Sequence, residues 1–339
     1  MVSSKGNGTN LVTSRLMTEA LEAPERVAQQ LAANNGAIAE VVRRLKARPP
    51  RFIVTSARGS SSHAARFGKY LIETRLGIFT AASAPSVSTL YKTPMKLDGA
   101  LFLSVSQSGR SPDLVVQAEA AKAARAMTVA LVNDIESPLA KVSDCVVPLG
   151  AGAETSVAAT KSFITSLTAL AQLVATWADD KALTAAMERL PGALAQAAKT
   201  EWELSLGAAE SFFVVGRGLG FAVASEAALK LKEVLGLHAE AYSGAEVLHG
   251  PVTLVEPGFP VLAFVQDDEA RLSMEDTLAK VAEKGAAVTR VPTGAEPLHP
   301  ALDLILQAQV FYPWVARAAV ARGLDPDRPR HLRKVTETL

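Results

Sequence analysis

The densest group of chemically useful side chains lies between Ser104 and Asp113, a segment that reads SVSQSGRSPD. It follows an apolar, strand-like run and leads through a glycine turn into a predicted helix with a proline near its first position. Such a turn leaves backbone N–H groups and the positive helix end at the carboxyl edge of a sheet. Four of its side chains carry hydroxyl or amide groups: Ser106, Gln107, Ser108 and Ser111.

These four groups exceed what a helix cap needs, so the turn predicts an uncharged cradle for a phosphate monoester. An ordinary N-cap turn is the alternative, and a single serine would satisfy it. The Gly-Lys-Ser/Thr ending of a nucleotide-binding loop is missing, which excludes that class of phosphate site.

A second hydroxyl-rich turn, RGSSSH, spans Arg58 to His63 at the end of another strand-like run. Because neighbouring strand ends of a doubly wound sheet converge on one crevice, Ser60 is placed to bind sugar hydroxyls beside the phosphate. A second helix cap would account for one or two of these serines equally well. We expect His63, at the start of the following helix, to lie at the surface.

Carboxylates and histidines gather later in the chain. Lys230 and Glu233 lie three positions apart, on one face of a predicted helix, and His238 and His249 follow. Spacing alone is typical of a solvated helix face with two isolated histidines. A carboxylate and histidines that flank a glycine-containing turn are also what proton transfer between neighbouring carbons requires. The residues alone leave both interpretations open.

The elements that must position these groups occur twice. Residues 52–59 resemble residues 211–218, and residues 103–107 resemble residues 262–266, both at an offset of 159 positions. A fixed register over separate strand-like runs indicates a duplication. The second copy reads QDDE over residues 266–269, which would repel phosphate, so only the first copy keeps the cradle.

In each copy apolar strands alternate with amphipathic helices, which predicts right-handed βαβ units and parallel sheets. The fold class is therefore α/β, with two tandem doubly wound, flavodoxin-like domains related by duplication. The strands after the first of each copy are expected at residues 100–105, 127–132, 145–149, 260–265, 286–291 and 304–306. Helices are expected at residues 62–75, 112–125, 222–235, 269–284 and 308–322.

Helical stretches are also expected at residues 20–45, with a break near Ala23-Pro24, and at 157–199, with turns at Asp179-Asp180 and Pro191-Gly192. The expected domain organisation places an N-terminal segment at 1–45 and a first, phosphate-binding domain at 46–185. A second domain with the catalytic base and histidine follows at 186–324, and an extended tail over the active site at 325–339.

Composition excludes several classes of partner. The net charge is +1, and the absence of like-charge blocks argues against nucleic acid and against a membrane surface. No Cys/His spacing predicts a metal site, and Cys145, the single cysteine, is expected in the core. Because the polar first ten residues show no signal peptide and no apolar run is long enough to span a membrane, we expect a cytoplasmic protein.

Four motifs together resemble the sugar isomerase (SIS) domains. They are the SQSG turn at 106–109, ETSVAATKSF at 154–163, ALKLKE at 228–233 and EVLHGP at 246–251. More narrowly, they resemble the isomerase half of glutamine:fructose-6-phosphate amidotransferase, from about Met17 to Leu339.

The resemblance implies roles for the matching positions. The cradle at 106–111 would hold the phosphate, while Ser60 and the Val157 backbone would contact the sugar. Glu233 resembles the base that moves a proton between the first and second sugar carbons. His249 is similar to the histidine that opens the ring from the neighbouring subunit, so a homodimer with a shared site is expected.

Two lysines complete the implied site. Lys334 resembles the lysine that contacts the open-chain sugar, and Lys230 would lie near the sugar oxygens. No cofactor is implied, because the open-chain aldehyde itself acidifies the neighbouring C–H. The chain departs from the family pattern at Arg333, which replaces a small residue before the tail lysine.

This sequence also shows no glutaminase domain, and its single cysteine is internal, so we expect exchange of free ammonia only. The predicted reaction is deamination of glucosamine 6-phosphate to fructose 6-phosphate and ammonia. The alternatives are a fructosamine-6-phosphate deglycase and a galactosamine-6-phosphate deaminase/isomerase. From another class, a non-catalytic sugar-phosphate sensor would need to lack the base, whereas Glu233, His249 and Lys334 are all present.

Overall fold

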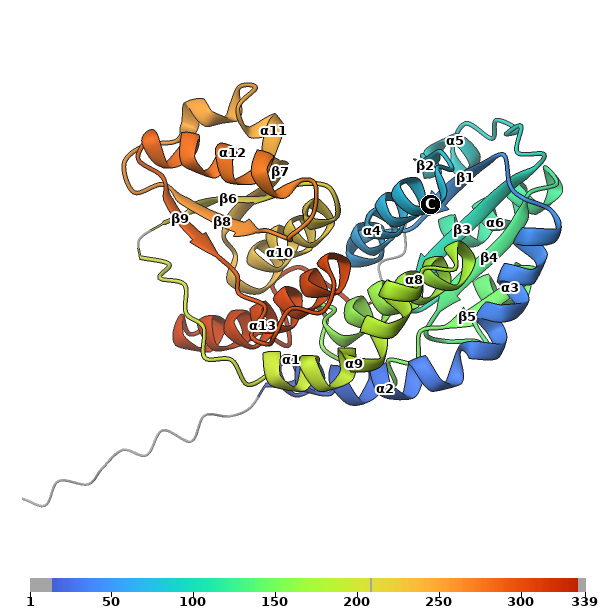
Figure 1. Ribbon diagram of the computed structural model, residues 1–339, viewed down its shortest axis with the longest axis horizontal. Helices are drawn as coiled ribbons and strands as arrows, with labels where there is room; N and C mark the ends of the chain where they lie inside the picture. The colour runs from blue at the N-terminus through green and yellow to red at the C-terminus, as the bar shows by residue number, and fades with distance from the viewer. Residues whose placement is uncertain (1–13, 208, 335–339) are drawn as a thin grey trace, which may run out of the picture.

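Two parallel β-sheets form the framework of the computed structural model, which describes residues 14–207 and 209–334 (Figure 1). The first sheet has the order β2-β1-β3-β4-β5. Its strands are β1 (Phe52–Ser56), β2 (Thr80–Ala82), β3 (Ala100–Ser106), β4 (Met127–Val132) and β5 (Cys145–Pro148). Parts of the predicted N-terminal segment (1–13) and tail (335–339) lie outside the described residues.

The second sheet repeats this arrangement with the order β7-β6-β8-β9. Its strands are β6 (Ser211–Gly216), β7 (His238–Ser243), β8 (Pro260–Phe264) and β9 (Ala287–Arg290). All strand pairs in both sheets are parallel. The central strand β3 is buried at every residue, as expected for a parallel strand covered on both faces. The predicted fold class is confirmed.

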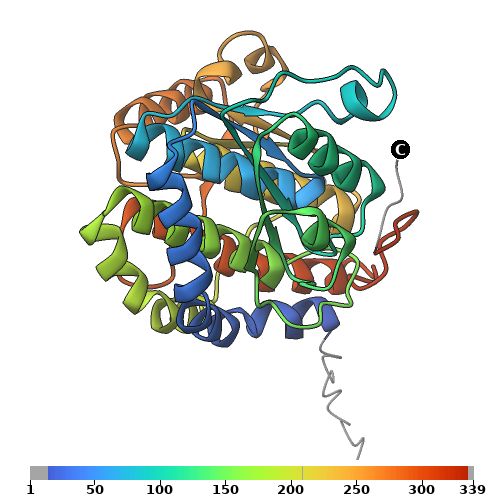
Figure 2. The same ribbon diagram turned by 90° about the vertical axis from the view of Figure 1, so that its right-hand side faces the viewer.

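Helices cover both faces of each sheet. The inner side, where the two sheets share one hydrophobic core, carries α2 (Ala23–Ala33), α3 (Asn35–Ala47), α4 (Gly59–Leu76), α8 (Lys161–Ala178), α9 (Lys181–Ala197), α10 (Leu219–Leu235) and α13 (Pro300–Ala321). The outer sides are covered by α6 (Pro112–Ala123) and α7 (Pro138–Val142), and by α11 (Gly244–Val247) and α12 (Arg271–Glu283). In both views α1 (Arg15–Leu21), α2 and α13 lie along one end of the molecule (Figures 1 and 2).

The two units meet where α4 packs against α10 (Figure 1). These helices are counterparts in the repeat, and Arg66 donates a hydrogen bond of 2.7 Å to Ser225, exactly one repeat away in sequence. The Arg66 guanidinium also lies 4.6 Å above the Phe221 ring. Contact between equivalent positions is the pattern of a two-fold interface, here formed within one chain.

Several predicted elements are wrong. Residues 304–306 belong to α13 rather than to a strand, because a short, wholly apolar run fits a buried helix as well as a strand. Pro191-Gly192 lies inside α9, where the buried side chains of Leu190 and Leu194 hold the helix together across the proline. The break predicted near Ala23-Pro24 lies one residue earlier, at Glu22. The N-terminal helices break a second time at Asn34, which was not predicted.

The edge strands β2 and β7 were not predicted, because β2 has only three residues and β7, with the sequence HAEAYS, is not a continuous apolar run. Cys145 lies in β5 and is buried, which confirms its predicted place in the core. None of the described helices is long and apolar enough to cross a membrane.

The serine turn depends on Gly109. This residue has φ of 62°, and a Cβ atom placed on it would lie 2.1 Å from the Ser137 Oγ atom. Ser137 is fixed because it caps α7 by accepting a hydrogen bond from the Ala140 N–H. The turn therefore tolerates no side chain at this position without moving α7.

Replacing Gly109 with Ala is expected to lower the free energy of unfolding by about 2–4 kcal/mol, through the left-handed backbone and the overlap with Ser137. The measurement is urea unfolding followed by circular dichroism. Gly36→Ala is the matched control, because Gly36 lies inside α3 with open space around it and should gain a few tenths to about 1 kcal/mol. Equal unfolding midpoints for the two variants would contradict this account of the turn.

Candidate active site

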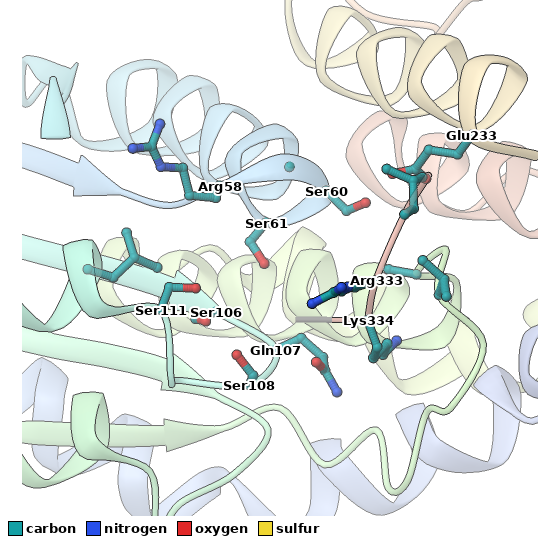
Figure 3. Close-up of a pocket in the computed structure, with 15 residues that line it drawn as sticks. Arg58, Ser60, Ser61, Ser106, Gln107, Ser108, Ser111, Glu233, Arg333 and Lys334 are labelled. Atoms are coloured by element: carbon teal, nitrogen blue, oxygen red, sulfur yellow. The ribbon is translucent and has the colours of Figure 1, made fainter. Parts of the chain in front are cut away.

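A cavity of about 380 Å³ opens beside the carboxyl end of the first sheet, between the start of α4, the end of α10 and the C-terminal tail (Figure 3). It is lined by Arg58, Gly59, Ser60, Ser61, Ser106, Gln107, Ser108, Ser111, Leu114, Val157, Ala159, Glu233, Leu332, Arg333 and Lys334. Most of the residues that the sequence assigned to phosphate, sugar and proton transfer therefore share one cavity.

The serine turn forms one end of this cavity. The Ser106 hydroxyl accepts a hydrogen bond of 3.0 Å from the Gly109 N–H, which closes the turn directly after β3. Ser111 is the N-cap residue of α6, yet its side chain makes no capping hydrogen bond. Its hydroxyl therefore does not serve the helix cap that was the alternative interpretation, and it faces the cavity instead. The arrangement offers hydroxyls, an amide and a helix N-terminus to an anion.

The opposite end holds a buried charge network. Lys230, whose side chain is completely buried, contacts Glu226 at 3.2 Å and Glu233 at 2.5 Å. Its ammonium group also donates a hydrogen bond of 3.1 Å to the Ser60 hydroxyl, which in turn donates one of 3.1 Å to Glu226. From α13 the Tyr312 hydroxyl donates to the same Glu226 oxygen at 3.2 Å. The network joins α4, α10 and α13.

Burial dominates the titration of this network. Burial, together with the Glu233 charge, raises the pKa of Glu226 to about 7 against the opposing effect of Lys230. Burial alone would lower the pKa of Lys230, but the two carboxylates outweigh it and raise the pKa, so the lysine stays charged. Glu233 is the member that reaches the cavity, with its side chain 20% exposed and one oxygen bound by Lys230.

The C-terminal tail forms the third side of the cavity. Lys334 lies in the cavity wall, and its ammonium group contacts the buried Glu154 at 3.3 Å. Val157, whose backbone is predicted to contact the sugar, lines the cavity, and its N–H donates a hydrogen bond of 3.3 Å to the Asp327 carbonyl. Asp327 also accepts hydrogen bonds from the first N–H groups of α1 through its carboxylate. The tail is thus anchored to α1 and to the segment that contains Glu154 and Val157.

Neither His63 nor His249 lines the cavity within this chain. His249 is exposed, in the turn between α11 and η1 (Pro251–Leu254), and does not line the cavity within this chain. The expectation that it enters the site of a neighbouring subunit stays a prediction. His63 is not a surface residue as predicted. Burial against α10, with the charges of Arg66 and Lys230, lowers its pKa to about 3, and its Nδ1 atom has no partner among the described residues.

The sequence reasoning assigned no role to Glu226, Tyr312 or the pair of Arg58 with Asp113. Glu226 and Lys230 have the i, i+4 spacing of an ordinary helix-surface pair, which hides the fact that both are buried. Tyr312 lies in the segment interpreted as strand and helix, far away in sequence. Among the described residues, no group of three or more His, Cys, Asp or Glu side chains is placed to hold a metal ion.

The fold combines two α/β units with one cavity that contains both the serine turn and the lysine-bound Glu233. Comparison with known families agrees, since the SIS domain family matches residues 48–176 and 205–293. The chain belongs to the SIS domain family, as the sequence motifs predicted.

Individual proteins and solved structures are also similar to this chain. The chain is 34% identical to glutamine--fructose-6-phosphate aminotransferase (isomerizing) of Symbiobacterium thermophilum, over 84% of the chain and 51% of that protein. It thus spans about half the length of the curated relatives it matches. A crystal structure of a candidate phosphosugar isomerase from Silicibacter pomeroyi DSS-3 has a TM-score of 0.87 at 44% identity and covers 93% of this chain and 100% of that one. Glucosamine-6-phosphate deaminase from Thermotoga maritima shares the fold, with a TM-score of 0.78 at 23% identity, over 96% of this chain and 100% of that one.

The raised pKa of Glu226 makes a prediction about stability. Because the folded protein binds this proton more tightly than the unfolded chain, the contribution of Glu226 to stability is present below about pH 4.5 and is lost as the pH rises towards 7. A shift from 4.5 to about 7 corresponds to a loss of about 3 kcal/mol. Glu226→Gln should remove this part of the decline in unfolding free energy between pH 5 and pH 8.

Urea unfolding of wild type and Glu226→Gln across that pH range measures the difference. Glu188→Gln is the control, since Glu188 is exposed on α9. A decline that is the same in all three proteins would show that Glu226 does not titrate in this range.

Proposed function

We propose that the chain deaminates an aminohexose 6-phosphate, with glucosamine 6-phosphate as the first candidate, to give fructose 6-phosphate and ammonia. The observation that carries the proposal is the position of Glu233 in the same cavity as the serine turn. A sugar whose phosphate binds the turn would direct its first and second carbons towards Glu233. The name of the relative from Symbiobacterium thermophilum, a fructose-6-phosphate aminotransferase, supports an amino sugar phosphate as the substrate class.

The proton transfer follows from the open-chain aldehyde. The C1 carbonyl acidifies the C2–H bond, and Glu233 removes that proton to leave an enolamine. Return of that proton to C1, together with transfer of one amine proton to the C1 oxygen, gives the ketose skeleton with a C1 hydroxyl and an imine at C2. Water adds to the imine carbon, and the C–N bond breaks to release ammonia and leave the C2 ketone. A single carboxylate serves both transfers because both carbons lie on the same edge of the substrate.

Lys230 prepares Glu233 for this role. Its contact at 2.5 Å fixes one carboxylate oxygen and leaves the other available to the substrate. Lys334 would leave Glu154 to bind the oxygen on which negative charge develops during enolisation. Opening of the sugar ring is assigned to His249 of a second copy, because His249 is exposed and lies outside the cavity of its own chain.

We expect free ammonia to be the nitrogen compound that this chain releases or takes up. Cys145 is buried in β5 and does not line the cavity, so no thiol chemistry is assigned to it. Deamination or its reversal by free ammonia needs only the groups that the cavity contains. A deglycase of fructosamine 6-phosphates and a galactosamine 6-phosphate enzyme would use the same groups, so the substrate panel must include both.

The direct test is ammonia release from glucosamine 6-phosphate, galactosamine 6-phosphate and fructose-lysine 6-phosphate, with the sugar product identified. We expect glucosamine 6-phosphate to give fructose 6-phosphate and ammonia with the highest kcat/KM. Preference for another member of the panel would reassign the substrate. If none of the three releases ammonia, an amine or a ketose phosphate, the catalytic proposal fails and a sugar-phosphate sensor becomes the better interpretation.

Glu233→Gln should lower kcat by a factor of about 10²–10⁴, because general base catalysis is lost, and should leave the Kd of the sugar phosphate nearly unchanged. Steady-state kinetics and calorimetric titration measure the two quantities. Glu283→Gln, at an exposed position of α12, is the control and should match wild type. An unchanged kcat in Glu233→Gln would remove Glu233 from the mechanism.

A shared site makes a prediction for mixed subunits. His249→Ala and Glu233→Gln should each be weakly active alone. After equal amounts are mixed, about half of the dimers contain one subunit of each kind, and one of the two sites in each such dimer is intact. The mixture should therefore recover up to about a quarter of wild-type activity. The subunits must first be exchanged by mild dissociation and reassociation. Mixed dimers that are isolated and remain inactive would place the whole site within one chain.

A further inference from the structure

The cavity contains four charged side chains: Arg58, Glu233, Arg333 and Lys334. Three of them have a described partner of opposite charge. Arg58 contacts the fully buried Asp113 at 2.7 Å, Glu233 is bound by Lys230, and Lys334 contacts Glu154. No carboxylate among the described residues lies within 4.0 Å of the Arg333 guanidinium. Arg333 therefore brings a positive charge into the cavity that residues 14–207 and 209–334 do not neutralise.

The position of this charge matters. Figure 3 shows the Arg333 side chain extending from the tail into the cavity, towards Ser61 and Gln107. That direction leads to the serine turn and away from Glu233 at the other end of the cavity. Arg333 is exposed in this structure, so its guanidinium is free to adjust when a ligand enters.

The groups of the serine turn that line the cavity carry no charge. Its lining groups are hydroxyls, one amide and the backbone, while a helix N-terminus contributes the equivalent of about half a positive charge. A phosphate monoester carries a charge of about −1.5 to −2 at neutral pH. Arg110, the basic residue within the turn, is paired with Asp134 at 2.7 Å and does not line the cavity. The Arg58 guanidinium is paired with the Asp113 carboxylate.

We propose that Arg333 binds the phosphate of the incoming sugar phosphate and is the specificity-determining cation of this site. The inference deepens the proposed function and rests on it, in that the ligand is a phosphorylated sugar. A guanidinium binds two phosphate oxygens through one rigid fork and adds a positive charge, which hydroxyls lack. Because Lys334 is the next residue, binding of the phosphate by Arg333 also draws the tail over the sugar and brings Lys334 to the open chain.

The experiment compares wild type, Arg333→Ala and Arg333→Lys by calorimetric titration with glucosamine 6-phosphate and with unphosphorylated glucosamine. Arg333→Ala should raise the Kd of glucosamine 6-phosphate roughly 10–100-fold, as expected for loss of a charge-assisted pair. Arg333→Lys should lie between wild type and Arg333→Ala, because it keeps the charge and loses the paired geometry. The affinity of wild type should also fall more steeply with added salt than that of Arg333→Ala.

Arg330→Ala is the matched control, because Arg330 lies in the same tail, is exposed and does not line the cavity. Its Kd should stay within about twofold of wild type, since an exposed charge away from the ligand contributes little. A Kd for Arg333→Ala equal to that of Arg330→Ala would overturn the proposal. So would an equal loss of affinity for phosphorylated and unphosphorylated sugar.

The outcomes separate this inference from the proposed function. Tight binding of sugar phosphate that depends on Arg333, without ammonia release, supports the role of Arg333 and refutes the deaminase. Ammonia release that is unaffected by Arg333→Ala in both kcat and KM supports the deaminase and refutes the role of Arg333. Failure of wild type to bind any sugar phosphate refutes both.

Discussion

The structure depends on how one buried positive charge is satisfied. Lys230 lies at the junction of the two units with no exposed surface, where the desolvation of an ammonium group costs several kcal/mol. Two carboxylates and a hydroxyl offset this cost, and they come from both units, because Ser60 begins α4 while Glu226 and Glu233 lie on α10. Both carboxylates lie on the same helix as Lys230, so Ser60 is the partner that links this network to the first unit. The contact between Lys230 and Glu233 within α10 fixes the oxygen of Glu233 at the cavity.

Much of the fold could be predicted from the sequence because its physical signals are local. Buried parallel strands such as β3 and β4 read as continuous apolar runs, and the offset of 159 positions revealed the second copy without any structural information. The failures arose where tertiary context decides. Residues 304–306 are all apolar, and such a short run fits either a strand or a buried helix. They form part of α13 because that long helix packs into the shared hydrophobic core.

The site was predictable to the extent that its parts are contiguous. Ser106 to Ser111 form a single turn, so their composition indicates an anion site directly. The buried network is not contiguous, since Ser60, Glu226 and Tyr312 meet only after the two units pack together. Burial cannot be read from an i, i+4 pair of charges, which usually marks a solvated helix face. The motif resemblance supplied Glu233 and Lys230, whereas only the three-dimensional structure explains why Glu226 accompanies them.

The duplication offers an internal comparison for that network. One repeat earlier, the positions of Glu226 and Lys230 are occupied by Phe67 and Leu71, which are both fully buried on α4. Apolar side chains therefore satisfy the same interface from the other side, in keeping with the general finding that buried ion pairs can be replaced by apolar groups without loss of stability. Stability alone does not require charges at these positions of α10. We infer that α10 keeps them because Glu233 needs a charged partner fixed at the floor of the cavity, so the two copies share an architecture and divide the chemistry between them.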